Sequence, residues 1–401
     1  MVFEIKLMPK HTLGFYLQLA SVGVGGFAEN LATNLSTLYF KDNDEYVRAI
    51  ERLESALRDI RIQVEDSDVC RIAESCEELQ PKLYPAGKKD PRILEEAGLN
   101  VVPERCGTRI SWCSATLSYI ERVKERGEPI GGRASTVMLA RTFTFGKLRG
   151  STGELDEEAQ IDSYSLGLML IGGLFSLVAS MRIGDRRFEL YMLPDGSPES
   201  LKVSNLVYKA FFYRTKKLGV SFEEVLRDIV GLERGLSIDL ATLNALLIHL
   251  SSVLSEMTAL AGLPEREGFE RFLLAKIDSS GNRPQLTWMS PLTISRTLIA
   301  LRGREELLES LWSLARVAAR LRRGKAKEQR DLGDDLASAI STCFNNITLF
   351  MWTRSSDHLL ECSRSISAIL DGAFKLGFEP RTAIAGQRVL KGIEEFTKQR
   401  L

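Results

Sequence analysis

An uncharged stretch of nineteen residues, Ser163 to Met181, limits the possible folds more than any other part of the chain. A helix needs about 20 mostly apolar residues to cross a bilayer, so this stretch is only just long enough. Its three glycines weaken a helix and lack the spacing of a membrane dimer motif. A polar–apolar alternation at 186–194 then predicts a strand ending at a Pro-Asp-Gly turn. We therefore predict a buried core helix that runs through a turn at 183–185 into a strand; a membrane span and a partner interface are the alternatives.

The overall composition favours a globular protein. The chain has 401 residues, of which 26% are charged and 44% hydrophobic, and both fractions are close to globular averages. The 53 basic and 53 acidic residues give a formal net charge of zero, so no global field draws the protein to nucleic acid or membrane. The first eleven residues mix acids, bases and apolar residues, which predicts no secretory leader. We therefore expect a cytoplasmic protein whose only polyanion sites are local patches.

The first part of the chain mixes strand and helix patterns, which predicts an α+β domain over residues 1–235. The patterns are a strand at 2–8, an apolar, glycine-punctuated helical stretch at 13–40, an amphipathic helix at 45–64, a helix closed by Gly127, and a strand at 133–150.

From about residue 200 onward, the pattern predicts helices only. Long helical periodicities are joined by short Gly or Pro breaks, with a loop at 279–291, which is typical of an antiparallel bundle. The predicted fold is an α+β N-terminal domain followed by an all-α helical bundle over 236–401, predominantly helical overall.

Four cysteines define a possible Cys-rich insertion over residues 70–113: Cys70, Cys76, Cys106 and Cys113. Four thiolates could hold a structural zinc ion, but both cysteine pairs are spaced more widely than zinc knuckles usually are. Disulfides are an alternative if the source is a hyperthermophile, and buried free thiols are another. Cys343 and Cys362 lie in apolar helical runs, where we expect plain core residues.

Catalytic motifs are scarce, so we expect a protein that is not an enzyme and has no cofactor beyond the possible zinc. The sequence has no nucleophile elbow, no zinc-protease helix and no phosphate-binding loop with its lysine. The three histidines are isolated from one another. His249 lies in an apolar run that predicts a core position, and His358 lies near an expected helix start.

The clearest charge feature is the basic segment 316–330, which carries seven bases and one acid. Its candidate phosphate ligands are Arg316, Arg320, Arg322, Arg323, Lys325 and Lys327. Helical spacing places Arg316, Arg320 and Arg323 on one side, away from the apolar stripe of the same helix. Exposed bases of this kind contact phosphates, although helix C-termini also favour cations without any ligand. A second candidate set, on the strand pattern 133–150, is Arg141, Lys147 and Arg149.

Three features together resemble the large subunit of the archaeal type I-A (Apern subtype) CRISPR effector, the Cascade complex. They are the opening strand followed by LGFYLQLASVGVGGFAENLA, the glycine-rich apolar helix leading to FELYMLPDG, and the helical second half. The resemblance spans most of the chain but includes no signature motif. It implies a non-catalytic subunit that helps recognise the motif beside the DNA target, with CRISPR RNA, target double-stranded DNA and other effector subunits as partners.

Two other classes of function stay open on the sequence. A protein-binding scaffold or adaptor would use its helical bundle to hold other proteins and would bind no nucleic acid. An uncharacterised enzyme would need a pocket that no motif indicates. Salt-sensitive DNA binding would distinguish the first class from the CRISPR subunit, and a bound cofactor would indicate the second.

Overall fold

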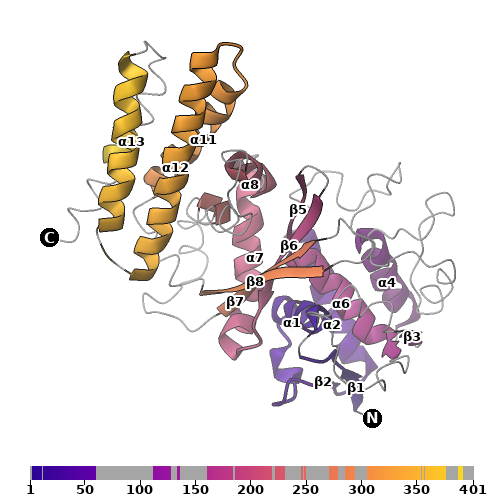
Figure 1. Ribbon diagram of the computed structural model, residues 1–401. Coiled ribbons are helices and arrows are strands. Elements are labelled where there is room, and N and C mark those ends of the chain that lie inside the picture. Colours follow the sequence, from indigo (N-terminus) through magenta and orange to yellow (C-terminus); the bar gives the residue numbers. More distant parts are fainter. Residues whose placement is uncertain are drawn as a thin grey trace, which may run out of the picture. The chain divides into compact units, whose positions relative to one another are not determined.

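The structure is a computed structural model (Figure 1). It describes residues 2–10, 12–59, 112–127, 133–135, 160–183, 186–218, 222–230, 245–246, 248–249, 271–278, 285–293, 305–353, 355, 357–375 and 387–391. The chain divides into two compact units, Met1–Lys216 with Gly268–Thr293, and Lys217–Glu267 with Ile294–Leu401. The sequence pattern placed a single boundary at 235, because it gave no sign that a later segment returns to the first unit.

Helix α1 (Leu13–Gly25) is a buried helix of the first unit, and all of its residues except Tyr16 are buried. Thr12 caps its start by accepting a hydrogen bond from the Phe15 N–H at 3.2 Å. Gly26, with φ of 65°, takes the left-handed conformation that ends the helix. The predicted helical stretch 13–40 is therefore wrong in its second half.

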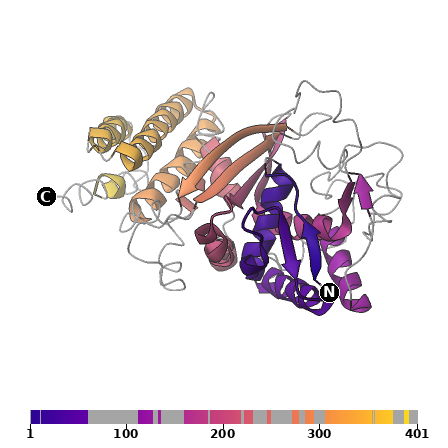
Figure 2. The same ribbon diagram turned by 90° about the horizontal axis from the view of Figure 1, so that it is seen from below.

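Instead, the chain after α1 returns to pair with its own beginning. A 3-10 turn η1 (Ala28–Asn30) leads into β2 (Thr37–Phe40), which pairs antiparallel with β1 (Phe3–Lys6). Helix α2 (Asn43–Leu57) follows, with Asp42 as its N-cap. These elements, drawn in indigo, gather together in Figure 2.

Helix α6 (Ser163–Ser176) occupies the uncharged stretch, and all of it except Tyr164 is buried. The Asp162 carboxylate begins the helix by accepting a hydrogen bond from the Ser165 N–H at 2.7 Å. The prediction of a buried core helix is confirmed, but its extent is wrong, because the chain passes at Leu177 directly into strand β5. In the described part of the chain, no helix has both the length and the apolar character that crossing a membrane requires.

A polar seam joins α6 to α1. The Ser21 hydroxyl donates to the Leu168 carbonyl at 2.6 Å, and the Gln18 side-chain amide donates to the Ser165 carbonyl at 2.8 Å. Each of these hydrogen bonds satisfies a buried group that would otherwise be costly. The two helices are therefore fixed in register as well as in distance.

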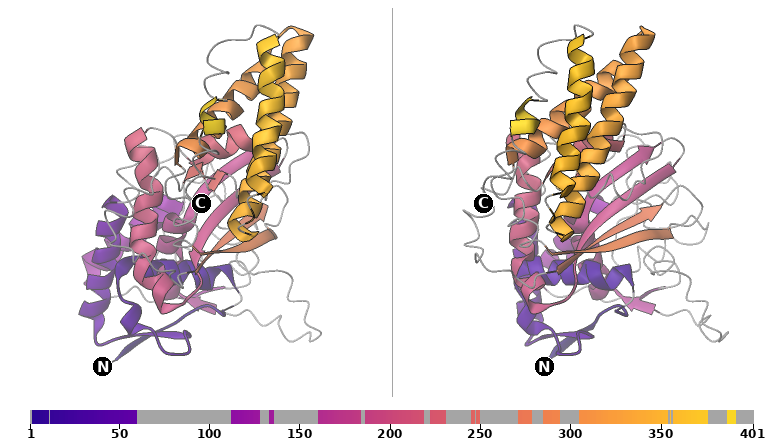
Figure 3. Two further views of the ribbon diagram at one scale, coloured as in Figure 1. Left: turned by 90° about the vertical axis from the view of Figure 1, so that its left-hand side faces the viewer. Right: turned by 60° about the vertical axis from the view of Figure 1, so that its left-hand side comes forward.

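The main sheet has four antiparallel strands in the order β5–β6–β7–β8, which fan out side by side in Figure 3. Strands β5 (Leu177–Ile183) and β6 (Arg186–Pro194) form the first hairpin. Helix α7 (Pro198–Leu218) packs on the sheet through Tyr208, whose hydroxyl donates to the Met192 carbonyl at 2.6 Å. Phe188 to Leu193 are all buried, so β6 is the core strand.

Strands β7 (Arg271–Asp278) and β8 (Gln285–Thr293) correct the expectation that no strand follows residue 200. Strand β8 also replaces residues 285–291 of the loop predicted at 279–291. Strand β7 pairs with β6 through partners such as Leu274 and Met192. Proline, which has no backbone N–H to donate, is tolerated at Pro291 because β8 is the last strand of the order and is paired on one side only.

Two further short strands and one helix complete the described part of the first unit. Helix α4 (Trp112–Arg126) packs against α6, and β3 (Arg133–Ser135) pairs with β4 (Gln160–Asp162). Tyr119 of α4 and Tyr46 of α2 are fully buried, and their hydroxyl oxygens lie 2.6 Å apart. Burial raises the pKa of both hydroxyls well above the usual value near 10.

We expect this tyrosine pair to make the protein sensitive to alkali. In the unfolded chain each tyrosine loses its proton near pH 10, whereas the folded protein keeps both protons, so stability is intact below pH 10 and falls above it. Each tyrosine should contribute up to about 1.4 kcal/mol per pH unit to the fall. Urea denaturation between pH 8 and 11 measures this fall. The free energy of unfolding of Tyr46→Phe/Tyr119→Phe should decline less steeply with pH than that of the parent protein. The exposed Tyr39→Phe is the control, and an equal decline in all three proteins would contradict the prediction.

The second unit is helical throughout its described elements. Helix α8 (Phe222–Val230) is followed along the chain by α11 (Glu305–Arg322), α12 (Lys327–Thr353) and α13 (Asp357–Lys375). Helices α12 and α13 lie side by side in every view (Figures 1 and 3). Together with the α+β first unit, this confirms the predicted fold class, which is predominantly helical overall.

Candidate nucleic-acid interface

Helix α11 separates an apolar side from a basic side, as its sequence predicts. Leu307, Leu311 and Leu314 are at most 2% exposed, whereas Arg316 and Arg320 are exposed. The apolar side packs within the second unit, so the arginines are left on the solvent side. The basic side therefore continues to the end of the helix, where the chain turns into α12.

The turn from α11 into α12 is tight and depends on glycine. The Arg323 N–H donates to the Arg320 carbonyl at 3.1 Å, and the Gly324 N–H donates to the Leu321 carbonyl at 2.8 Å. A Cβ at Gly324 would lie 2.9 Å from the Leu321 carbonyl oxygen, closer than real Cβ atoms approach backbone oxygens. The backbone thus holds the end of α11 and the start of α12 in one defined conformation.

Two of the cations in this segment stabilise the turn itself. The Arg322 Nε lies 2.6 Å from the Asp334 carboxylate on α12, and its side chain is only 19% exposed. The Arg330 guanidinium donates to the carbonyls of Gly324 and Lys325 at 3.3 and 2.8 Å. Arg322, predicted from the sequence as a phosphate ligand, is therefore already engaged in an ion pair. Sequence reasoning missed this role because the partner comes from the next helix.

Four other cations at the turn are exposed and have no ion pair with any described residue: Arg320, Arg323, Lys325 and Lys327. We call these four residues the basic turn. The acids closest in sequence, Glu328 in the first turn of α12 and Asp331 one residue beyond that turn, are also exposed. Water solvates the four cations, so a phosphate group would exchange with water and counterions rather than break an internal contact.

Arg316 lies one helical turn before the basic turn and has a different environment. Its guanidinium carbon lies 4.4 Å from the centroid of the Trp312 ring, which is cation–π geometry. The Trp312 indole N–H in turn donates to the Asp228 carboxylate of α8 at 3.0 Å. The predicted set of six cations thus divides into the basic turn, the ion-paired Arg322 and the stacked Arg316.

The remaining predicted site residues lie outside the part of the chain whose side chains the structure describes. Arg141, Lys147, Arg149, Cys70, Cys76 and Cys106 lie outside the described residues, and for Cys113 only the helical backbone of α4 is described. Within the described part of the chain, no group of three or more His, Cys, Asp or Glu side chains could hold a metal ion. Zinc, disulfides and free thiols all stay predictions for these four cysteines.

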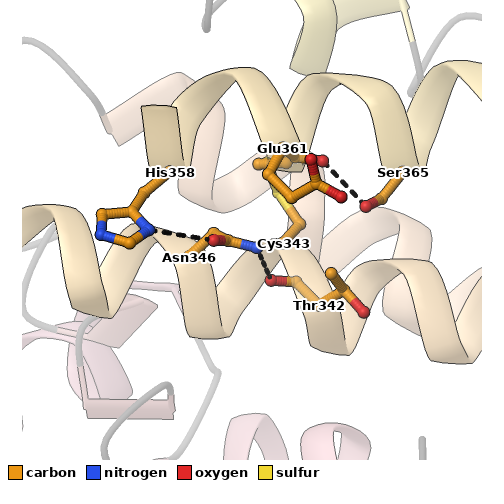
Figure 4. The surroundings of a disulfide bond; sticks show 7 residues. Thr342, Cys343, Asn346, His358, Glu361 and Ser365 are labelled. Carbon is orange, nitrogen blue, oxygen red and sulfur yellow. Dashed lines mark hydrogen bonds between the residues drawn. A yellow bond between two sulfur atoms is a disulfide. The ribbon is translucent and has the colours of Figure 1, made fainter. Parts of the chain in front are cut away.

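A disulfide between Cys343 and Cys362 joins α12 to α13 (Figure 4). Both residues are fully buried, as predicted for core positions, but the expectation that they do nothing else is wrong. Nearby, the Asn346 side chain donates to the Thr342 carbonyl at 2.9 Å, and its oxygen lies 3.3 Å from Nδ1 of His358. The sequence did contain a signal for this bond. Each of two consecutive predicted helices carries one cysteine in its apolar run, and a helical hairpin can bring two such residues together.

The other histidine of the second unit lies where its sequence predicts. His249 is fully buried, and its ring meets the ring of Phe222 edge-on at 5.5 Å. His358 is half-buried beside Asn346. Neither histidine lies in the basic turn, so the candidate site consists of cations alone.

No protein-family model matches this chain, and no curated protein is significantly similar to it in sequence. A function must therefore be inferred from the residues and their arrangement.

Proposed function

We propose that this chain is a non-catalytic, nucleic-acid-binding large subunit of a CRISPR RNA-guided, DNA-targeting complex. Its partners would be CRISPR RNA, target double-stranded DNA and the other effector subunits, in the cytoplasm. The single observation that supports this proposal best is the basic turn, in which four exposed cations have no ion pair with a described residue and lie where α11 turns into α12.

The chemistry of the basic turn suits phosphates better than it suits bases. Lysine and arginine side chains release condensed counterions when they neutralise phosphates, and this gain does not depend on sequence. In an RNA-guided complex, base pairing reads most of the target, and the protein needs mainly backbone contacts and a short adjacent motif. A chain of zero net charge with a local cluster of cations fits this division of labour.

Removal of three members of the basic turn should flatten the salt dependence of DNA binding. For Arg320→Ala/Arg323→Ala/Lys325→Ala, the slope of log affinity against log salt should fall by about two to three units, because each phosphate contact contributes about 0.9. The loss should be similar for unrelated sequences. The measurement is the affinity of the whole chain for a short DNA duplex at several salt concentrations, repeated with the reconstituted complex.

The matched control removes three exposed arginines of the first unit, Arg48, Arg52 and Arg126, and so lowers the net charge equally. It should leave the slope closer to that of the parent protein. Equal slopes for all three proteins would reject the basic turn as a nucleic-acid site and favour a protein-binding scaffold. Arg322 and Arg330 are kept in both variants, since they hold the turn together.

A further inference from the structure

Arg316 differs from the basic turn because its side chain is held in place by two other residues. Trp312 is only 6% exposed and is anchored at its indole N–H by Asp228, 3.0 Å away on α8. The Arg316 guanidinium stacks on this fixed ring at 4.4 Å while the residue as a whole stays exposed. A long surface side chain is thus restrained on one side by a buried aromatic platform.

Stacking on an aromatic ring leaves the hydrogen-bonding capacity of arginine intact. The N–H donors of a guanidinium lie in its plane and point outward from its edges, whereas the tryptophan ring covers only one face. No described carboxylate lies within ion-pair distance of Arg316. The planar group is therefore preorganised to donate two parallel hydrogen bonds to an oxyanion.

The position of Arg316 places it in line with the basic turn. Arg316 and Arg320 lie one helical turn apart on α11, and Arg323 begins the turn directly after the helix, so that about 10 Å of rise separates the first from the last. Phosphates of one strand follow each other at about 3.4 Å of rise along a DNA axis, so a row of this length can meet more than one phosphate.

We propose that Arg316 is a preorganised ligand for a nucleic-acid phosphodiester, with Trp312 and Asp228 as its positioning residues. The proposal rests on the proposed function, in which the basic turn binds the same backbone. Asp228 has two opposed effects: its hydrogen bond fixes the indole, and its negative charge repels the phosphate that Arg316 binds. Replacement by asparagine separates the two effects, because the side-chain oxygen can still accept the indole hydrogen bond.

The test compares four single variants for affinity and salt slope on a short DNA duplex. Arg316→Ala should raise Kd about tenfold and reduce the slope by about one unit. Arg316→Lys should restore the slope, because the positive charge returns. It should restore only part of the affinity, because lysine cannot donate the two parallel hydrogen bonds of a guanidinium. Trp312→Phe should weaken binding at unchanged slope. Asp228→Asn should keep the slope and lower Kd, by up to about fivefold.

These outcomes separate the inference from a purely structural role. If Trp312 and Arg316 only hold α8 against α11, the variants will lose thermal stability while the folded protein keeps its Kd and slope, and the inference is overturned. Should Arg316→Ala fail to fold, Arg316→Gln keeps the side-chain length without the charge and tests the same point.

The experiment distinguishes failure of the role of Arg316 from failure of the proposed function. If the triple variant of the basic turn flattens the slope and Arg316→Ala does not, the inference is wrong and the nucleic-acid site stands. If neither changes the slope, both are wrong.

Discussion

Gly172→Ala is expected to lower the free energy of unfolding by about 3 kcal/mol, although alanine is the better helix former. A Cβ at this position would overlap the carbonyl oxygen of Leu17 on α1 and lie 2.6 Å from its carbonyl carbon. The obstacle is backbone, so no side-chain rotation can relieve it. Helices α1 and α6 would have to separate, and the seam of hydrogen bonds from Ser21 and Gln18 would stretch with them.

Gly14→Ala is the matched control for this prediction, because it adds the same atom to the same pair of helices. Its Cβ would meet the Met169 sulfur at 3.0 Å and the Met8 Cγ at 3.2 Å, both in flexible side chains. Methionine adapts to such intrusions, so the cost should stay below about 1 kcal/mol. Urea denaturation followed by circular dichroism measures both variants. Equal stability of Gly172→Ala and the parent protein would show that α1 and α6 do not cross at Gly172.

The elements that could be predicted from the sequence are those whose burial follows a local period. The apolar spacing of α11 predicts which side is buried, and the uncharged stretch predicts that α6 lies in the core. Both expectations are confirmed by the burial of Leu311, Leu314 and Leu170. The exposure of Arg316 and Arg320 follows from the same helical period.

The features that could not be predicted depend on partners that are distant in the chain. Strand β7 pairs with β6 across the intervening helices, and no local pattern states which strands meet. Likewise, the ion pair of Arg322 with Asp334 requires knowledge of the turn between α11 and α12. The stacking of Arg316 on Trp312, four residues earlier in the same helix, depends instead on the rotamers of the two side chains. The sequence therefore indicated where cations cluster but not which of them are available to a ligand.

Loss of the disulfide between Cys343 and Cys362 is expected to destabilise the second unit by about 3 kcal/mol. The bond closes a loop between residues 19 apart, and cross-linking a loop of this size removes about that much conformational entropy from the unfolded chain. The thermal midpoint of Cys343→Ala/Cys362→Ala should accordingly fall by roughly 6 to 12 °C.

Dithiothreitol supplies the second arm of this experiment. Both cysteines are fully buried, so the reductant reaches the bond only when α13 opens from α12, and heating with dithiothreitol should lower the midpoint of the parent protein. The same reagent should leave the double variant unchanged. A shift that persists in the double variant would instead reveal a second reducible bond, for which Cys70, Cys76, Cys106 and Cys113 are the remaining cysteines. Equal midpoints for the parent protein with and without dithiothreitol would contradict a stabilising bond between α12 and α13.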